Sequence, residues 1–371
     1  MADRYWVGTS QDFHSAANWS ATSGGAGGAG VPTSSDDVFI DGNGYALCWA
    51  HTPFECNDLS LVTGASELLI IDQGCIIHGD FLIEDGYFGP TGGGGYTVEF
   101  KGNWLNTGGT FSVGTGTGVD PTCEFSGIGK TYNLNSLSAA SFQHVLVSGE
   151  VIFSGTRLSI MNISQKLNIT GKMTVNANWL TICAIDLSGL NAGFGTFTGT
   201  LKGTGRLWYR YRSTHMMVTT GTISIKYFRY KLETVSGVHN IPARQYETSC
   251  TVEVYFDFAD QIARLGEGDH YFLGPVTLRT DSGGSGAISG EFDCDTNTAR
   301  MWVGGKFDIE KNSFYGGTLT LKLGNGIHVF RGSIDFYFSY GAGATTVLDV
   351  QAGEGTIILW PKGLRLTSPS Q

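Results

Sequence analysis

The stretch VEFKGNWLNTGGTF, from Val98 to Phe111, indicates the fold of this chain. It predicts a short strand, a tight Gly/Asn turn and another strand, because alternating apolar residues give way to turn-forming ones. Related runs follow in VGTGTG (Val113–Gly118), CEFSG (Cys123–Gly127) and FQHVLVSGEVIFSG (Phe142–Gly155). A loose period of roughly 20 to 25 residues is typical of a solenoid, in which each coil buries its inner face against the next.

The composition fits a rigid all-β protein. Glycine accounts for 55 of the 371 residues, about twice its usual ~7% share, and proline is rare. The hydrophobic fraction of 41% and the aromatic fraction of 12% can supply a core. Charged residues are only 15%, against the usual ~25%. Ser, Thr, Asn and Gly must therefore cover much of the surface, as in extracellular or virion β-proteins.

The charge balance and the cysteines exclude several classes of function. A net charge of −10 argues against a nucleic-acid partner, which requires a basic footprint. The seven cysteines are odd in number and include no CxxC pair, so neither a zinc site nor a disulfide framework is indicated. We expect buried single thiols, with a Cys48–Cys56 bridge left open. No motif suggests a cofactor.

No targeting or membrane segment is evident in the sequence. The N-terminal residues lack the charged and then apolar regions of a secretory signal peptide. No apolar run approaches the ~18 residues that a membrane span needs. We therefore expect a protein that is made in the cytoplasm and does not insert into a membrane.

Three regions can be distinguished along the chain. Residues 1–45, with the Gly-rich loop Ser23–Gly30, are expected to be a cap or attachment segment, because an open solenoid end must be covered. Residues 46–235 are expected to form the β-helix. Residues 236–371 are expected to form either further coils or a more antiparallel, sandwich-like domain. The one helix candidate is FADQIARL, Phe258–Leu265.

The opening and two blocks of the sequence resemble a known group of proteins. The residues that carry the resemblance are Arg4–Gly8 with Asn18–Ser20, the block Gly102–Phe111, and the block Phe142–Gly155 with the coil Leu167–Met173 that follows. This layout is similar to β-helical proteins encoded by tailed bacteriophages and prophages, and similar blocks occur in autotransporter passengers and adhesins. The resemblance covers roughly residues 4 to 180. It implies a right-handed parallel β-helix displayed on a virion or cell surface.

Most motifs of catalysis or ligand binding are missing or incomplete. Gly129-Lys130-Thr131 ends like a phosphate-binding loop, but Glu124 occupies the position where that motif needs its first glycine. Asp36, Asp37 and Asp41 could approach one Ca²⁺, although a hard cation needs 6 to 8 converging oxygens. Solvated loop carboxylates are the simpler interpretation, and no metal site is predicted.

Two pairs of carboxylates are candidates for catalysis. Glycoside hydrolysis needs two carboxyl groups about 5–9.5 Å apart. Glu253 and Asp257 share one strand face, but at ~3.4 Å per residue their backbones are ~13–14 Å apart. Asp293 and Asp295 are closer, at ~7 Å on the same arithmetic. The alternative for all four is that they are ordinary outward-facing groups.

Two segments are rich in basic and aromatic residues, although the chain as a whole has few charged residues. In each segment, cations and aromatic rings are expected on one strand face. The two segments are RLWYRYR (Arg206–Arg212) and IKYFRYK (Ile225–Lys231). Such faces bind anionic sugars or other subunits through stacking and forked hydrogen bonds. The alternative is a cation–π ladder that only covers a strand. The candidate contact residues are Arg206, Trp208, Arg210, Arg212, Tyr227 and Arg229.

Together these observations favour a structural or receptor-binding component of a phage particle, without enzymatic activity. A tail spike, a fibre and a capsid decoration protein all fit. The expected partners are other virion proteins, a host surface glycan and the chain itself as a homotrimer, the last by resemblance to phage spikes. The alternatives are a polysaccharide depolymerase, since this fold also hosts such enzymes, and a bacterial surface adhesin.

Overall fold

The structure is a computed structural model, and it describes most but not all of the chain. The described residues are 2–45, 47–62, 68–90, 95–112, 121–133, 140–154, 159–176, 183–187, 193–211, 222–232, 237–241, 245–246, 250–256, 261–265, 269–281, 290–294, 300–313, 317–340, 346–351, 356–359 and 364–367. They contain many short strands and one short 3-10 turn, η1 (Ala16–Asn18), but no α-helix. The chain divides into two compact units, unit 1 (1–186 and 195–201) and unit 2 (187–194 and 202–371).

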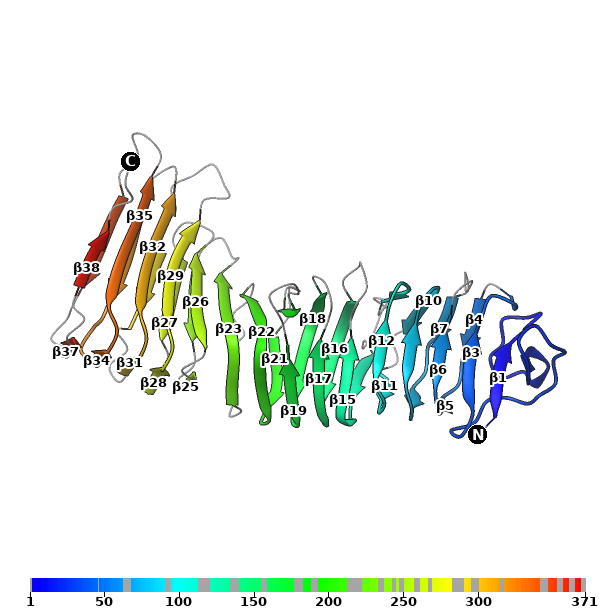
Figure 1. The fold of residues 1–371 in the computed structure, drawn as a ribbon. Coiled ribbons are helices and arrows are strands. Elements are labelled where there is room, and N and C mark those ends of the chain that lie inside the picture. The colour runs from blue at the N-terminus through cyan, green and yellow to red at the C-terminus, as the bar shows by residue number, and fades with distance from the viewer. Residues whose placement is uncertain are drawn as a thin grey trace. The chain divides into compact units, whose positions relative to one another are not determined.

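Unit 1 is a parallel β-solenoid whose strands stack in three columns (Figure 1). Column A contains β1 (Asp3–Trp6), β3 (Asp37–Ile40), β6 (Leu59–Leu61), β9 (Phe81–Ile83), β12 (Trp104–Asn106), β15 (Ile128–Asn133), β17 (Glu150–Ser154) and β19 (Lys172–Val175). Column B contains β5 (Phe54–Cys56), β8 (Cys75–Ile77), β11 (Thr97–Phe100), β14 (Thr122–Phe125), β16 (Ala140–Val147), β18 (Ser159–Ile169) and β20 (Cys183–Leu187). Column C contains β4 (Leu47–Ala50), β7 (Leu68–Ile71), β10 (Tyr87–Pro90) and β13 (Thr110–Phe111).

The strand register gives the period of the coils. In column B the aligned, inward-facing residues are Phe54, Cys75, Val98, Cys123, Val145 and Leu167, which are all buried. Successive members lie 21 to 25 residues apart in the sequence, so the expected period is confirmed. The stretch Val98–Phe111 spans one strand of each column, β11, β12 and β13.

Aromatic side chains fill the interior of unit 1. In column A, Phe81, Trp104, Tyr132 and Phe153 are aligned from strand to strand and buried. The Trp104 ring lies 5.1 Å from that of Phe81 and 4.6 Å from that of Phe111, both edge to face. Aromatic pairs at such distances add to the stabilisation from buried area. The core is therefore a continuous stack that runs through the coils.

The N-terminal residues of unit 1 cover the first coil. β1 pairs in parallel with β3 and antiparallel with β2 (Trp19–Ser20). The rings of Trp6, Phe13 and Trp19 are fully buried, and the Phe13 ring lies 4.4 Å from that of Phe54 in the first strand of column B. The indole N–H of Trp19 donates to the Phe13 carbonyl at 2.6 Å. These buried rings therefore pack the N-terminal residues against the first coil, and their role as a cap remains a prediction.

Unit 2 is built in the same way from longer strands. Column D contains β23 (Thr222–Leu232), β26 (Thr251–Phe256), β29 (Val276–Asp281), β32 (Phe307–Ser313), β35 (Ile334–Tyr340) and β38 (Leu364–Thr367). Column E contains β25 (Gln245–Tyr246), β28 (Asp269–Phe272), β31 (Arg300–Val303), β34 (Ile327–Phe330) and β37 (Thr356–Leu359). Column F contains β24 (Gly237–Ile241), β27 (Gln261–Leu265), β30 (Gly290–Asp293), β33 (Gly317–Lys322) and β36 (Thr346–Gln351). The remaining strands are β21 (Gly193–Phe197) and β22 (Thr200–Tyr211).

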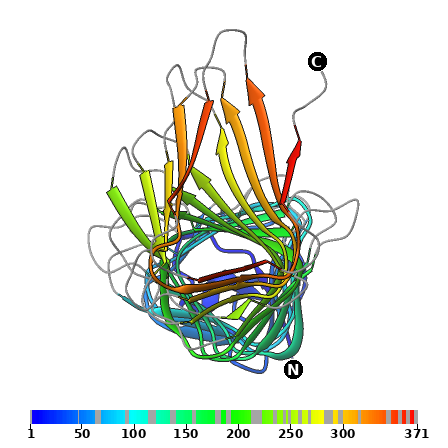
Figure 2. The same ribbon diagram turned by 90° about the vertical axis from the view of Figure 1, so that its left-hand side faces the viewer.

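The described pairings within columns D, E and F are all parallel, and Figure 2 shows neighbouring strands of this unit running in the same direction. The described strands between residues 236 and 371 therefore form further coils, and the antiparallel, sandwich-like alternative is wrong for that described part. The boundaries expected at residues 45 and 235 remain predictions.

The helix expected at Phe258–Leu265 is also wrong. Its described part, Gln261–Leu265, is strand β27, which pairs in parallel with β24 and β30. Gln261 faces the interior, where its amide donates to the Leu232 carbonyl at 2.9 Å. A polar residue at an inward position hid the strand alternation, and a two-turn helix is only marginally stable by itself.

Candidate functional site

The two basic and aromatic segments meet in unit 2 around the ring of Tyr227. The Arg206 guanidinium lies 5.5 Å from the centroid of that ring, and the Arg229 guanidinium lies 5.6 Å from it. Arg229 also lies 5.4 Å from the ring of Tyr255 on β26. We call these residues, together with Glu253, the Tyr227 cluster. Arg206 is exposed, so its charge is available to a ligand, and a cation over an aromatic face is attracted by the ring quadrupole.

Glu253 is the buried centre of the cluster. Because Arg229 and Glu253 are register partners on β23 and β26, the Arg229 Nε lies 2.5 Å from Glu253 Oε2. The Tyr227 hydroxyl donates to the same carboxylate, and Arg279 Nη1 lies 3.9 Å from its other oxygen. Only 5% of the Glu253 side chain is exposed, and a charge buried to that degree must be paired.

The pKa values in the cluster reflect this pairing. Burial, followed by the hydrogen bond to Glu253, raises the pKa of Tyr227 to about 12. Burial alone would lower the pKa of Arg229, but the charge of Glu253 and the contact with Tyr227 outweigh it and raise the pKa. At neutral pH the cluster therefore holds a protonated tyrosine and a fixed ion pair.

The other predicted contact residues are only partly described. Trp208 lies on β22 and is partly exposed. Arg210 lies on the same strand, but its side chain is outside the described part of the structure, and Arg212 is outside the described residues altogether. The structure thus brings together Arg206, Tyr227 and Arg229 of the six candidates.

The carboxylates proposed for catalysis are engaged in ion pairs where they are described. Glu253 belongs to the Tyr227 cluster on column D. Asp293 lies on column F, where its Oδ2 is 2.7 Å from Arg264 Nε and only 6% of its side chain is exposed. Asp257 and Asp295 are outside the described residues. A carboxylate held this way serves as a structural anchor, whereas a general acid or base needs access to substrate.

Around the cluster, the outer face of column D is a network of balanced charges. Arg279 on β29 lies 3.9 Å from both Glu253 and Glu310. Lys306 lies 2.7 Å from Asp308 and 3.0 Å from Asp335. Rows of opposite charges across neighbouring strands stabilise a sheet. This face is thus a scaffold that presents the exposed Arg206 and the Tyr227 ring.

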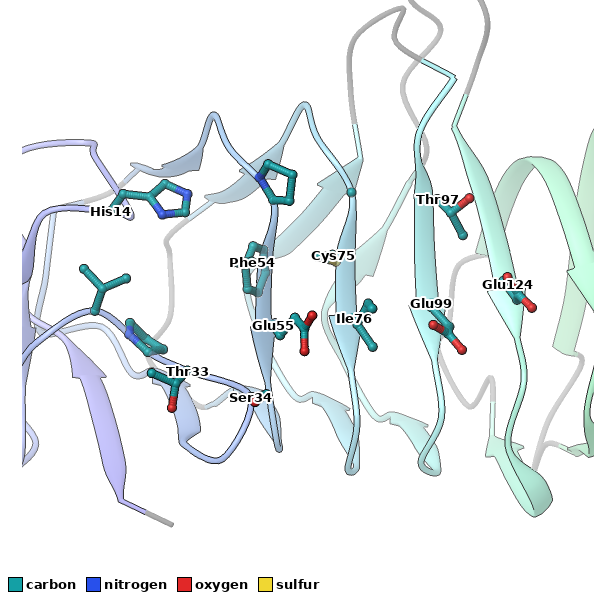
Figure 3. Close-up of a pocket in the computed structure, with 14 residues that line it drawn as sticks. His14, Thr33, Ser34, Phe54, Glu55, Cys75, Ile76, Thr97, Glu99 and Glu124 are labelled. Carbon is teal, nitrogen blue, oxygen red and sulfur yellow. The ribbon is translucent and has the colours of Figure 1, made fainter.

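A second feature, missed by the sequence analysis, is a groove in unit 1 (Figure 3). It has a volume of about 700 Å³ and is lined by Glu55, Glu99 and Glu124 of column B and by residues 31–34 of the N-terminal segment. A signal was present in the sequence, because the three glutamates are the middle residues of the triplets FEC, VEF and CEF. In each triplet the flanking residues face the core and the glutamate faces outward.

The part of the chain that the structure describes holds few other functional signs. It contains no helix that is long and apolar enough to cross a membrane. It contains no group of three or more His, Cys, Asp or Glu side chains suited to a metal ion. The six cysteines whose side chains the structure describes, at positions 48, 56, 75, 123, 250 and 294, are buried free thiols, as expected.

Comparisons with protein-family models, with curated proteins and with solved structures found no match for the chain.

Proposed function

We propose that the chain is a structural or receptor-binding component of a bacteriophage particle, as a tail spike, a fibre or a capsid decoration protein. The observation that supports this proposal is the parallel β-solenoid architecture of each unit, in which the coils stack around a buried core and the outer faces can present contacts. The low content of charged residues, 15%, agrees with a rigid surface protein.

The proposed role is binding rather than catalysis. Glu253 and Asp293 are nearly buried and ion-paired, which supports a structural role for both. The exposed Arg206 over the Tyr227 ring suits an anionic sugar or an acidic surface of another subunit. Pure protein spotted on a lawn of host bacteria should therefore leave no halo, and a clear halo would favour the depolymerase alternative.

The proposal is tested on particles from the cells that encode the chain. Gradient-purified particles should contain the chain by mass spectrometry, and antibodies raised against it should label intact particles in electron micrographs. Particles that lack the chain would contradict the proposal. A neighbourhood of secretion genes, with no phage genes, would favour the adhesin alternative.

The contact role of the Tyr227 cluster has its own test. Arg206→Ala removes an exposed cation, so we expect weaker binding to host cells or weaker self-assembly with little change in thermal stability. Lys226→Ala, an exposed cation on β23, is the matched control. Multi-angle light scattering at micromolar concentration reports assembly, and the proposed homotrimer fails if the chain is monomeric there. Unchanged cell binding and assembly in Arg206→Ala would remove the contact role.

A further inference from the structure

The groove in unit 1 has a chemical character distinct from the Tyr227 cluster. Of its lining residues that the structure describes, three are glutamates and none is Lys or Arg. Apart from His14, its other walls are apolar or hydroxylic, including Pro32, Pro53, Ile76 and Thr97. The groove therefore combines negative charge with flat apolar surface, inside a chain of net charge −10.

The strand register sets the spacing of the three carboxylates. Glu55, Ile76, Glu99 and Glu124 occupy equivalent outward positions on β5, β8, β11 and β14. Neighbouring strands are about 4.8 Å apart, so the backbones of Glu99 and Glu124 are separated by one such step and those of Glu55 and Glu99 by two. Figure 3 shows the three glutamates on one face, with Ile76 on the strand between those of Glu55 and Glu99. These three carboxylates therefore suit a ligand that extends across the strands.

Contacts with the following coil orient two of these carboxylates. The Ser126 hydroxyl donates to Glu99 Oε1 at 2.5 Å, and the Ser148 hydroxyl donates to Glu124 Oε1 at 2.5 Å. Glu55 Oε2 lies 2.8 Å from His78 Nε2, and both side chains are partly exposed. Lys101 Nζ is 3.6 Å from Glu99 and is itself partly exposed. A weak exposed pair of this kind is easily exchanged for another cation.

The groove floor does not suit a peptide that adds a strand. β8 is already hydrogen-bonded to β5 on one side and to β11 on the other, so the strands beneath the groove have no free edge for β-augmentation. A ligand must bind through the side chains alone. Carboxylates match protonated amines and hydroxyl groups, and the apolar walls match the C–H faces of sugar rings.

We infer that this groove binds an oligosaccharide of amino sugars with free, protonated amino groups. Glu99 and Glu124 hold ammonium groups of neighbouring sugar units, and Glu55 holds one further along the chain. This inference goes beyond the proposed function, because it concerns another site and holds whether or not the chain is part of a phage particle.

Titration calorimetry with the full chain tests the inference, using a glucosamine oligomer as the probe. The oligomer should bind the wild-type protein, and binding should weaken as salt is raised, because screening reduces the attraction. Glu99→Gln and Glu124→Gln should each weaken binding about tenfold, the effect of losing one charge-assisted hydrogen bond. Glu150→Gln, an exposed glutamate outside the groove, should bind like the wild type. Circular dichroism checks that each variant is folded.

Four results would overturn the inference. The first is no binding at about millimolar oligomer, which corresponds to a binding free energy of only ~4 kcal/mol, and the second is wild-type affinity in both groove variants. The third is equal binding of the N-acetylated oligomer, which has the same backbone without the charge. The fourth is equal binding of spermine, which would assign the groove to free polyamines. Absence of the chain from phage particles would leave this experiment unaffected, so the two failures are distinguishable.

Discussion

At the scale of single residues, glycine decides how closely the coils of unit 1 can stack. At the corner between columns B and A, one glycine of each coil lies above that of the coil before it; these are Gly79, Gly102, Gly127, Gly149, Gly171 and Gly199. A Cβ on Gly149 would lie 2.2 Å from the Gly127 carbonyl oxygen. The same corner carries the hydrogen bond from Glu150 N–H to that oxygen, at 2.9 Å. The unusual glycine content thus has a packing cause.

Gly149→Ala should lower the stability of the chain by about 2–3 kcal/mol, because the corner must open to admit a methyl group. Gly129→Ala is the control. Gly129 has a φ of +66° and nothing within 4 Å of an added Cβ, so that change should cost only about 1 kcal/mol of conformational strain. Thermal unfolding followed by circular dichroism gives the comparison. Equal losses in the two variants would show that close approach is not the cause.

Glu253→Gln should lower stability by about 2–3 kcal/mol. This is less than the ~3–5 kcal/mol expected for breaking a fully buried pair, because 28% of the Arg229 side chain is exposed. Glu150→Gln breaks the exposed pair with Lys172, whose side chains are 46% and 38% exposed, and should cost less than about 1 kcal/mol. Chemical unfolding measures both. A larger loss in Glu150→Gln would refute the buried role of Glu253.

At the scale of elements, the strands of unit 1 depend on the aromatic column that links their inner faces. Trp104→Ala should destabilise the chain by about 3–5 kcal/mol, because it leaves a cavity among the rings of Phe81, Phe100 and Phe111. Leu105→Ala, on the same strand but 40% exposed, is the control and should stay within about 0.5 kcal/mol. If both variants unfold at the wild-type temperature, the column does not hold the coils together.

The strands were largely predictable from the sequence, whereas their side-chain partners were not. Alternation and turn residues indicated strands within Val98–Phe111, where the structure has β11, β12 and β13, because the inward positions there are apolar except for Asn106. β27 was missed because Gln261 faces inward. Glu253 was expected to face outward, and it does, but Arg229 and Arg279 from neighbouring coils bury it. Burial by side chains of neighbouring coils depends on the strand register, which cannot be read from the sequence pattern alone. The groove glutamates were missed for the same reason.

At the scale of the whole molecule, both units use parallel coils, but their interiors differ in chemistry. In unit 2 the inward column of β28, β31 and β34 contains His270, Met301 and His328, and both histidines are fully buried. Burial lowers the pKa of His328, although its contact with the Leu323 carbonyl opposes this. His328 therefore resists protonation only while unit 2 is folded.

This difference predicts an acid sensitivity of unit 2. The unfolded state binds a proton at His328 near the usual pKa of about 6.5, and the folded state binds it at a lower pH. The contribution of neutral, buried His328 to stability is therefore fully present above about pH 6.5, and it decreases as the pH falls below that value. Thermal unfolding between about pH 8 and 5 should show this decrease, and His328→Phe should reduce it. Met301→Leu, which changes a non-titrating neighbour in the same inward column, should leave it unchanged. A decrease that persists undiminished in His328→Phe would contradict the prediction.

The description of this molecule rests on coils that stack in parallel register, with aligned residues 21 to 25 positions apart in column B of unit 1. A crystal structure of the full chain, at a resolution that places side chains, tests it most directly. The account predicts Phe81, Trp104, Tyr132 and Phe153 on four successive parallel strands, with Glu55, Glu99 and Glu124 along one outer face. Antiparallel pairing of these segments, or their separation into different layers, would contradict it.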